Sequence, residues 1–519
     1  MKVLRSDSVE LVESAFARPR AHAARLEDML CGEDMMRKSH SDLEAMLHGA
    51  GLEWARLMLE ENLRLRAQVE QKTSVVGSDG VARKGARDSE RHLETLVGRV
   101  PVERLAYQAP GAIDLHPMDA ALNLPRELYS HGIRRLVAKE AAKCSFDDVI
   151  ESVHDFTGTT IGKRQVEELA VRAAEDFHAF YERRAVLRKG SSDLLIISTD
   201  GKGIVMRHED LREPTRLAAE KSAHKIQTRL SRGEKTNRKR MAQVATVYSI
   251  APFVRGPGDI LHSLRDAKDI DTKRPRPTDK RVWASVAQTS RSVIREAFEE
   301  AKRQDPDGER RWVVLVDGDP TQLRSVKAEA KRMRVKVTIL ADIVHVIERL
   351  WTAARALFGE NNSKSEKWVE DRLRALLTGS SGGAVAKTIR WWAARKKDLT
   401  SAAKASIKRS CAYLADRTRT RLMRYQQALR DGLPIATGVI EGACRHVVKD
   451  RMDKTGARWS LSGAEAVLRL RAIRASKDFD AYWEFHLERE KERNHGSRYQ
   501  DAKIPEALAV RRTKLRRIK

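Results

Sequence analysis

The chain has 519 residues, of which 100 are Lys or Arg and 73 are Asp or Glu, so its formal net charge is +27. This length corresponds to roughly two to four domains. Such a basic excess favours a nucleic-acid partner, because cations neutralise phosphates and release counterions. A ribosomal protein or a membrane-surface protein would have a similar charge, so charge alone indicates no catalysis.

The cysteines and the apolar segments exclude further classes. Four cysteines occur, and none forms a CxxC pair, which argues against a disulfide scaffold and a zinc ribbon. The first residues contain no apolar segment of signal-peptide length. No stretch approaches the ~20 apolar residues of a membrane helix. We therefore expect a reduced, cytoplasmic protein.

Residues 1–75 are predicted to form a helical N-terminal region. Apolar residues recur there at steps of three and four, which is typical of one face of an amphipathic helix: Leu43, Leu47, Ala50, Trp54 and Leu57. The helices could bind DNA or a second protomer. Residues 76–92 are rich in Gly, Ser, Lys and Arg, a composition that predicts a linker.

Residues 93–190 are predicted to contain a β-hairpin and a helix-turn-helix. Segments 93–100 and 102–107 alternate like two strands around Gly98–Pro101. Ser145 opens a helix as its N-cap, a turn follows at 157–160, and Lys163 and Arg164 begin the next helix. This pattern is typical of a DNA reader with a basic leading edge; a tight helical corner without DNA is the alternative.

Residues 191–480 are predicted to form an α/β domain. Three strands open it in succession, and helices at 281–304, 320–332 and 342–357 join or follow the later strands. A basic helical insertion is expected at about 358–432, and residues 481–519 read as a charged helix and a basic tail. The predicted strands are 194–199, 203–207, 242–250, 312–316 and 335–340.

Two aspartates and a glutamate stand in contexts that suggest chemistry. Asp200 and Asp317 each end an apolar strand-length run and are each followed by glycine, which permits close approach of another chain. An unpaired carboxylate at the end of a buried strand is costly unless metal or solvent compensates it. With Glu441, these side chains could bind two Mg²⁺ ions ~4 Å apart for in-line phosphoryl transfer. Turn formation by each aspartate is the alternative.

Auxiliary residues lie beside these acids. Asp319, two positions after Asp317, is a rival metal ligand. Asp342 and His345 share a helix face just after a strand, so this pair could contact the scissile phosphate or orient a ligand. A capping aspartate beside a packed histidine explains the same pattern equally well.

Basic residues supply candidate DNA contacts. Segment 225–240 has seven basic residues against one acid and ends in Arg238, Lys239 and Arg240, which favours a backbone-contacting loop, although a solvated charge run is the alternative. Arg451, Lys454, Arg458 and Trp459 combine cations with an aromatic ring, as expected for gripping a strand and stacking a base. Cys444 is expected to pack. Further candidate phosphate contacts are Lys202, Arg445 and Lys449; Arg445 could instead form an exposed ion pair with Glu441.

Taken together, these segments resemble the DDE transposases of bacterial insertion sequences, in particular the ISKra family. The resemblance spans roughly residues 95–475. It rests on the order and number of motifs rather than on any single one: Ser198-Thr-Asp-Gly-Lys-Gly203, Val316-Asp-Gly318, Asp342-Ile-Val-His345, Gly438-Val-Ile-Glu-Gly442 and Arg451-Met to Trp459-Ser460.

The resemblance implies an RNase H-like catalytic core with Asp200, Asp317 and Glu441 as metal-binding triad. It also implies two Mg²⁺ ions per site with Mn²⁺ as a substitute, recognition of element ends by the N-terminal part, and a homo-oligomer, expected to be a dimer, on paired DNA ends in the nucleoid. Relatives that carry cysteines near the hairpin suggest a zinc module, but this chain has no cysteine from 32 to 143, so none is expected.

The sequence thus predicts a transposase that cuts at the ends of its element and transfers the exposed 3′-hydroxyl into target DNA. An RNase H-like nuclease without strand transfer and a catalytically silent DNA-binding protein are the alternatives. A basic RNA-binding structural protein would leave the two Asp-Gly strand ends unexplained.

Overall fold

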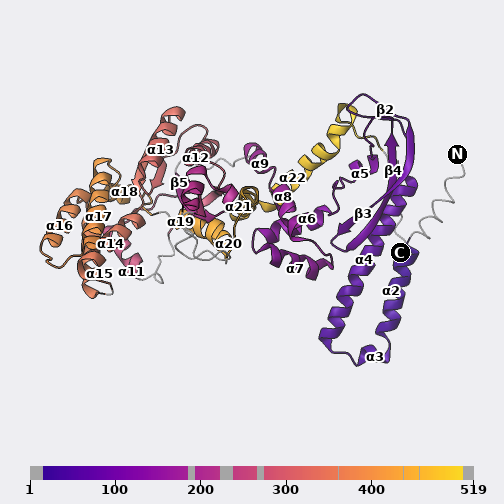
Figure 1. Ribbon diagram of the computed structural model, residues 1–519, viewed down its shortest axis with the longest axis horizontal. Coiled ribbons are helices and arrows are strands. Elements are labelled where there is room, and N and C mark those ends of the chain that lie inside the picture. The colour runs from indigo at the N-terminus through magenta and orange to yellow at the C-terminus, as the bar shows by residue number, and fades with distance from the viewer. Residues whose placement is uncertain are drawn as a thin grey trace. The chain divides into compact units, whose positions relative to one another are not determined.

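The computed structural model describes residues 16–184, 193–221, 238–265, 274–360, 362–436, 438–454 and 456–506. The chain forms two compact units, which are described separately (Figure 1). Unit 1 combines Met1–Glu182 with Phe479–Lys519, and unit 2 is Arg183–Asp478. No helix in the described ranges has the length and apolar character needed to span a membrane.

Unit 1 begins with a helical hairpin. Helices α2 (Ala17–Leu30) and α4 (His40–Val69) lie side by side, joined by α3 (Glu33–Met36) (Figure 1). The Ser39 side chain caps α4 by accepting the Asp42 N–H, and Arg18 of α2 pairs with Glu60 of α4 at 2.6 Å. The predicted helix is confirmed, but its apolar stripe is only partly covered, because Leu57 is buried whereas Trp54 is 42% exposed.

Strands occupy much of the segment predicted to be a linker. β1 (Val75–Val76) pairs with β2 (Ala82–Arg83), and β3 (Gly85–Thr95) pairs antiparallel with β4 (Gly98–Gln108). The linker prediction for 76–92 is therefore wrong, because β3 has only two buried residues and lacks the apolar alternation that marks a half-buried strand. The predicted hairpin is present, but its turn precedes Gly98 and Pro101 lies within β4.

Helices complete unit 1. α7 begins with the capping box of Ser145 and Asp148, and Gly158 ends it at φ +67°, so the predicted serine cap and glycine turn are confirmed. α6, α7 and α8 pack against one another. The remaining elements are α5 (Pro117–Ala121), α6 (His131–Ala141), α7 (Phe146–Thr157), α8 (Lys163–Ala173), α9 (Phe177–Arg183), α22 (Phe479–Asn494) and the 3-10 turns η4 (Gly496–Arg498) and η5 (Gln500–Ala502).

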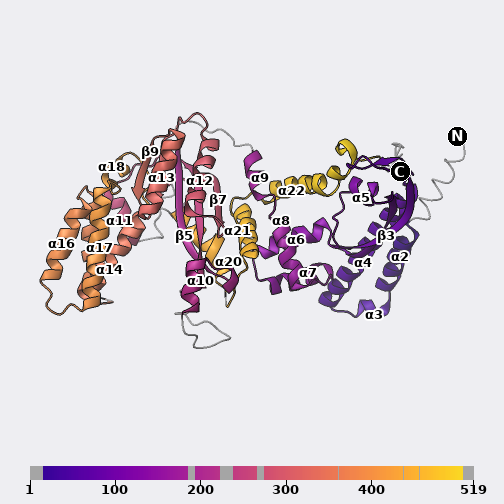
Figure 2. The ribbon, with the colours of Figure 1, turned by 45° about the horizontal axis from the view of Figure 1, so that its top comes forward.

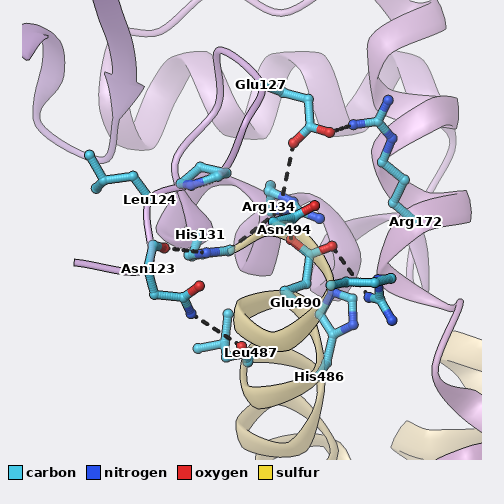
Figure 3. A network of polar contacts seen from close by, with 12 residues as sticks. Asn123, Leu124, Glu127, His131, Arg134, Arg172, His486, Leu487, Glu490 and Asn494 are labelled. Atoms are coloured by element: carbon cyan, nitrogen blue, oxygen red, sulfur yellow. Dashed lines mark hydrogen bonds and ion pairs between the residues drawn. The ribbon is translucent and has the colours of Figure 1, made fainter. Parts of the chain in front are cut away.

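The C-terminal helix α22 is anchored in unit 1 by a buried polar network (Figure 3). Arg134 of α6 is fully buried and donates a 2.5 Å hydrogen bond to Glu490 of α22. His486 of α22, also fully buried, donates to Asp176 at 2.7 Å. Removing one partner would leave a charge buried without compensation, at a cost of about 3–5 kcal/mol, so these pairs hold α22 in one position.

Unit 2 is built on a five-stranded mixed sheet in the order β7-β6-β5-β8-β9. β5, β6 and β7 are successively antiparallel, whereas β8 and β9 run parallel to β5. The strands are β5 (Leu194–Val205), β6 (Lys239–Ile250), β7 (Thr278–Ser285), β8 (Trp312–Val316) and β9 (Val337–Ala341). The chain is therefore a mixed α/β protein, as predicted.

Two secondary-structure predictions in unit 2 are wrong. Residues 194–199 and 203–207 are not two strands, because β5 runs through Asp200 and Gly201 while β6 pairs with it throughout. Residues 281–285, predicted as helix, belong to β7. Its charged opening, Thr-Asp-Lys-Arg, hides the short buried run that follows, and α12 begins only at Ser290.

Helices cover the sheet on both faces (Figure 2). Ile196, Val313, Leu315 and Leu340 pack with α14 (Ile343–Phe358) in one large core. On the opposite face, Trp312 contacts Phe298 of α12 (Ser290–Gln304) with ring centroids 6.1 Å apart, and α13 (Pro320–Met333) packs on α12. Asp200 and Asp317 continue the α14 face, because side chains alternate along a strand.

Helices follow α14 as predicted for residues 358–432, and several share its core: α15 (Ser363–Leu377), α16 (Gly382–Ala394), α17 (Ser401–Arg419) and α18 (Tyr425–Arg430). The chain then returns to the sheet through α19 (Gly438–Ala443), the π-helix η3 (Cys444–Lys449), α20 (Asp450–Met452) and α21 (Leu461–Ala475). Shorter elements are η1 (His208–Asp210), α10 (Glu213–Glu220) and α11 (Pro257–Arg265).

Candidate active site

The sheet register aligns the residues just before Asp200 with those just before Asp317 on neighbouring parallel strands. Leu195 to Ser198 pair with Trp312 to Leu315, each partner lying 117 positions further along the chain, as it does for Ser198 and Leu315. Asp317 lies at the same offset from Asp200. The pairing ends at Ser198 and Leu315, so the two half-buried aspartates each lie two positions beyond the last pair of neighbouring strands.

Both oxygens of the Asp200 carboxylate accept hydrogen bonds. The Gly201 N–H donates to Oδ1 at 2.7 Å, and the Cys444 thiol donates to Oδ2 at 3.2 Å. Burial, followed by the charge of Asp200, raises the pKa of Cys444 well above its usual range. Cys444 is thus a neutral donor that joins η3 to β5. The sequence predicts only packing for Cys444. The one sequence signal for its contact with the site was its position, three residues after Glu441.

Glu441 lies in the same neighbourhood on α19. Its side chain is exposed at the surface, yet partial desolvation raises its pKa, and the charges of Glu348 and Asp200 raise it further while His345 opposes them. Interactions with both Asp200 and His345 place the three groups around one region. A carboxyl with a raised pKa gains from a nearby cation.

Asp317 is held between β8 and the helices that follow α14. Its Oδ1 accepts the Asp319 N–H at 2.8 Å, and its backbone carbonyl accepts the Tyr413 hydroxyl of α17 at 3.0 Å. Gly318 has φ +89°, and Arg417 of α17 packs directly against it. The glycine predicted to permit close approach therefore does so for a side chain of this protein.

The two auxiliary aspartates are helix caps. Asp319 Oδ1 accepts the N–H groups of Thr321 and Gln322 at 2.8 and 2.9 Å, which caps α13. Asp342 is buried and caps α14 by accepting the Val344 N–H at 2.9 Å. Of the readings left open for Asp342, capping is the one observed, and the same use of Asp319 favours capping over metal binding there.

His345 lies one turn into α14, partly buried. Its Nδ1 donates to Glu348 at 3.3 Å. Burial lowers the pKa of His345, but the hydrogen bond with Glu348 and the charges of Asp342, Glu348 and Asp200 outweigh it, so the net shift is upward. An imidazole that is more readily protonated beside the carboxylates can contact a phosphate.

The donor atoms suit a hard divalent ion, since Asp200, Asp317 and Glu441 offer carboxylate oxygens, which Mg²⁺ prefers. Among the described residues, however, no three His, Cys, Asp or Glu side chains are gathered closely enough to hold a metal. Asp200 Oδ2 accepts the Cys444 thiol, and each carboxylate oxygen has a second lone pair that an ion can use. The chemistry of the set fits Mg²⁺.

Several predicted DNA contacts are exposed in unit 2: Lys202, Lys239, Arg445, Lys449, Lys454 and Arg458. Arg445 Nε lies 3.9 Å from Asp450, so its ion pair is not with Glu441. Segment 225–237 lies outside the described residues, and Arg238 is partly buried. In unit 1, exposed Lys163 and Arg164 begin α8, where Lys163 pairs with Asp147 at 2.6 Å and Arg164 with Glu168 at 3.0 Å.

Three side chains are placed differently from the prediction. Arg451 and Trp459 are buried, with the guanidinium 4.7 Å from the ring centroid, and the Trp459 indole donates to the Met452 carbonyl at 3.1 Å. Neither is available to grip or stack DNA, because both are buried and Trp459 joins α20 to the end of β5. Arg240 donates to the carbonyls of Val286, Asp210 and Ala287 and is likewise structural.

No protein-family model and no curated protein matches this chain.

Proposed function

We propose that this protein is a metal-dependent DNA transposase with an RNase H-like catalytic core in unit 2. The observation that carries the proposal is that Asp200 and Asp317 each lie two positions beyond the last paired residues of neighbouring parallel strands, with the segment of Glu441 joined to Asp200 through Cys444. The strand order and directions support the RNase H-like assignment, since three antiparallel strands are followed by two parallel ones.

Asp200, Asp317 and Glu441 would hold Mg²⁺, with Mn²⁺ as a substitute, and two bound ions would supply activation of the attacking oxygen and stabilisation of the leaving one. The residues of the chain position the substrate. Asp317 is held from both sides by Asp319 and Tyr413, and Asp200 by Gly201 and Cys444. Such fixed geometry is the main protein contribution to phosphoryl transfer.

The cations around the carboxylates support a DNA substrate. Lys202 follows Asp200 on β5, and exposed Arg445 and Lys449 follow Glu441, so all three can neutralise phosphates near the scissile bond. His345, whose pKa is raised, can donate to a phosphate oxygen. Water would act as first nucleophile, and the 3′-hydroxyl that it releases would attack target DNA at the same site.

Recognition of the element ends is assigned to unit 1. The α7–α8 corner, with Lys163 and Arg164 at the start of α8, supports this assignment. Cutting two ends requires two active sites, so we propose a homodimer that pairs the ends.

The test is incubation of the purified protein with a labelled duplex that carries an end of its element and Mg²⁺, beside Asp317→Ala. We expect metal-dependent cleavage and joining that the variant loses while it still binds DNA. Cleavage that persists in Asp317→Ala would refute the site.

Two alternatives give different outcomes. A nuclease without strand transfer would cut the duplex but leave pre-cut 3′-hydroxyl ends unjoined. If the protein is a catalytically silent DNA-binding protein, the wild type and Asp317→Ala should bind the duplex equally well. Neither should then cut it with Mg²⁺ or with Mn²⁺.

A further inference from the structure

A cavity of about 590 Å³ opens in unit 2 where β8 and β9 begin. The ends of α12 and α13 and the loop before β8 line it. Among its described lining residues, only Asp307 is acidic, and five are basic: Lys302, Arg310, Arg311, Arg334 and Lys336.

This cavity is separate from the candidate active site. Trp312, the first residue of β8, lines it, whereas Asp317 directly follows the last residue of the same strand. Five residues of a strand extend ~16 Å. The cavity and the carboxylates therefore lie at opposite ends of β8.

Three of the cations lack partners. Within the described part of the chain, the side chains of Lys302, Arg334 and Lys336 make no hydrogen bond and no ion pair. Neighbouring basic residues on the same two helices do, since Arg303 pairs with Glu300 at 2.9 Å and Arg332 with Glu329 at 2.5 Å. Like charges around one cavity repel one another, and an anion removes that repulsion.

The walls of the cavity are held by contacts outside it. Arg310 donates to Ser249 at 2.7 Å, Arg311 to Asp431 at 2.8 Å, and the Trp312 indole to Asp305 at 2.7 Å. These bonds fix the floor and one side, so an anion would enter a site that is already formed.

The helix dipoles account for some of the basic residues that line the cavity but not for all of them. α12 ends at Gln304 and α13 at Met333, and cations near helix C-termini are favourable without any ligand. Lys302 and Arg334 fit that account. Arg311 and Lys336 belong to neither helix and directly precede β8 and β9. The helix dipoles therefore do not account for these two basic residues.

We propose that this cavity binds backbone phosphates of DNA, as a second DNA contact of unit 2 beyond the active site. Its volume lies within the ~300–1,000 Å³ of ligand sites, which exceeds the needs of one phosphate ion. Trp312 is only 2% exposed and offers no stacking surface, so the site reads phosphate and not base. That the phosphate belongs to DNA rests on the proposed function and on the net charge of +27.

The test compares two double variants of the full chain. Lys302→Gln/Lys336→Gln removes two cavity cations, and Lys327→Gln/Lys331→Gln removes two exposed lysines of α13 that do not line the cavity. Lys302 and Lys331 both lie in the last turn of a helix, so the effect on the helix dipole is matched. Thermal melting of both variants verifies that they fold.

Duplex affinity is then measured by filter binding across a salt series without divalent metal. The cavity variant should bind ~5–10-fold more weakly, and its salt slope should fall by about 1–2, because each lost phosphate contact removes ~0.9 from the slope. The control variant should keep the slope of the wild type. Equal losses in both variants, or no loss in the cavity variant, would overturn the proposal.

Calorimetric titration with inorganic phosphate distinguishes the source of the anion. Tight phosphate binding that the cavity variant loses, with its DNA affinity unchanged, would identify a free-phosphate site and refute the DNA assignment. Cleavage at saturating DNA should survive in the cavity variant. Asp317→Ala should show the reverse pattern, with DNA binding kept and cleavage lost. The two variants therefore separate DNA binding from cleavage.

Discussion

Asp317 and Asp319 are separated by one glycine, yet their carboxylates have different surroundings. Asp317 follows a buried strand beside Asp200, whereas Asp319 accepts two N–H groups at the start of α13. The proposed function therefore gives these neighbouring acids different tasks, metal binding for Asp317 and helix capping for Asp319.

Substituting each of these aspartates by alanine should separate the tasks. Asp319→Ala should destabilise the start of α13 by about 1 kcal/mol, seen as faster hydrogen exchange at Thr321 and Gln322, with cleavage activity largely kept. Asp317→Ala should abolish cleavage and, because it removes the acceptor of the Asp319 N–H, cost about 0.5–1.5 kcal/mol of stability. Loss of cleavage in both variants with no change in exchange would contradict this assignment.

Cys444 should act as a positioning residue for Asp200. Cys444→Ala removes the donor to Asp200 Oδ2, and because hydrogen bonds to charged groups contribute about 1.5–3 kcal/mol, single-turnover cleavage should slow by roughly 10-fold or more. Cys444→Ser keeps a donor and should recover most of the rate. If serine and alanine slow cleavage equally, with unchanged DNA binding and melting, the hydrogen bond has no such role.

The residues of the site were only partly predictable. Asp200 and Asp317 could be placed, because both follow recognisable buried runs. The contact of Cys444 with Asp200 joins positions 244 residues apart, which no local pattern reveals. Because its neighbours in the sequence are basic, Trp459 was predicted to stack on DNA. The burial of Trp459 depends on packing against β5, which its own segment does not reveal.

At the scale of elements, α17 reaches the site through its contact with Gly318. Gly318→Ala should destabilise unit 2, since a positive φ costs a non-glycine residue about 1–2 kcal/mol and the new Cβ would overlap Arg417. Denaturant unfolding of Gly318→Ala, Arg417→Ala and the double variant measures both effects. The double variant should cost less than the sum of the single ones; strict additivity would show that Arg417 does not restrict this position.

The elements themselves were predicted unevenly. β8 was predicted with its exact bounds and the end of β6 correctly, because apolar runs with clear ends mark buried strands. β7 was missed and β5 was divided, since Asp-Gly-Lys-Gly reads as a turn. The pairing of β5 with β6 through these residues is a long-range contact, which overrides the local preference for a turn.

At the scale of the whole molecule, the two units should respond differently to acid. In unit 1, burial lowers the pKa of His131 from 6.5 to about 4. Burial would raise the pKa values of Asp176 and Glu490, but Asp176 is held at about 2 by His486 and Arg493, and Glu490 at about 2 by Arg134. In all three groups the folded pKa lies below the unfolded one, so the folded unit binds fewer protons.

Unit 1 should therefore lose stability as pH falls, first from about 6.5 to 4 through His131 and then from about 4.5 to 2 through the two carboxylates. Hydrogen exchange of peptides from α22, compared with peptides from β8, measures this in the intact chain. Asp176→Asn should reduce the loss of stability between about pH 4.5 and pH 2. The loss between about pH 6.5 and pH 4 should stay as in the wild type. Equal acid sensitivity of α22 and β8 would contradict the assignment to unit 1.

The return of α22 to unit 1 has a consequence for biosynthesis. Arg134 on α6 emerges from the ribosome long before its partner Glu490, because all of unit 2 lies between them in the chain. At ~5–20 residues per second, the intervening synthesis of about 300 residues takes roughly 15–60 s. During that time the nascent N-terminal segment exposes the surface that α22 will cover, so the unit whose synthesis starts first is the last to be completed.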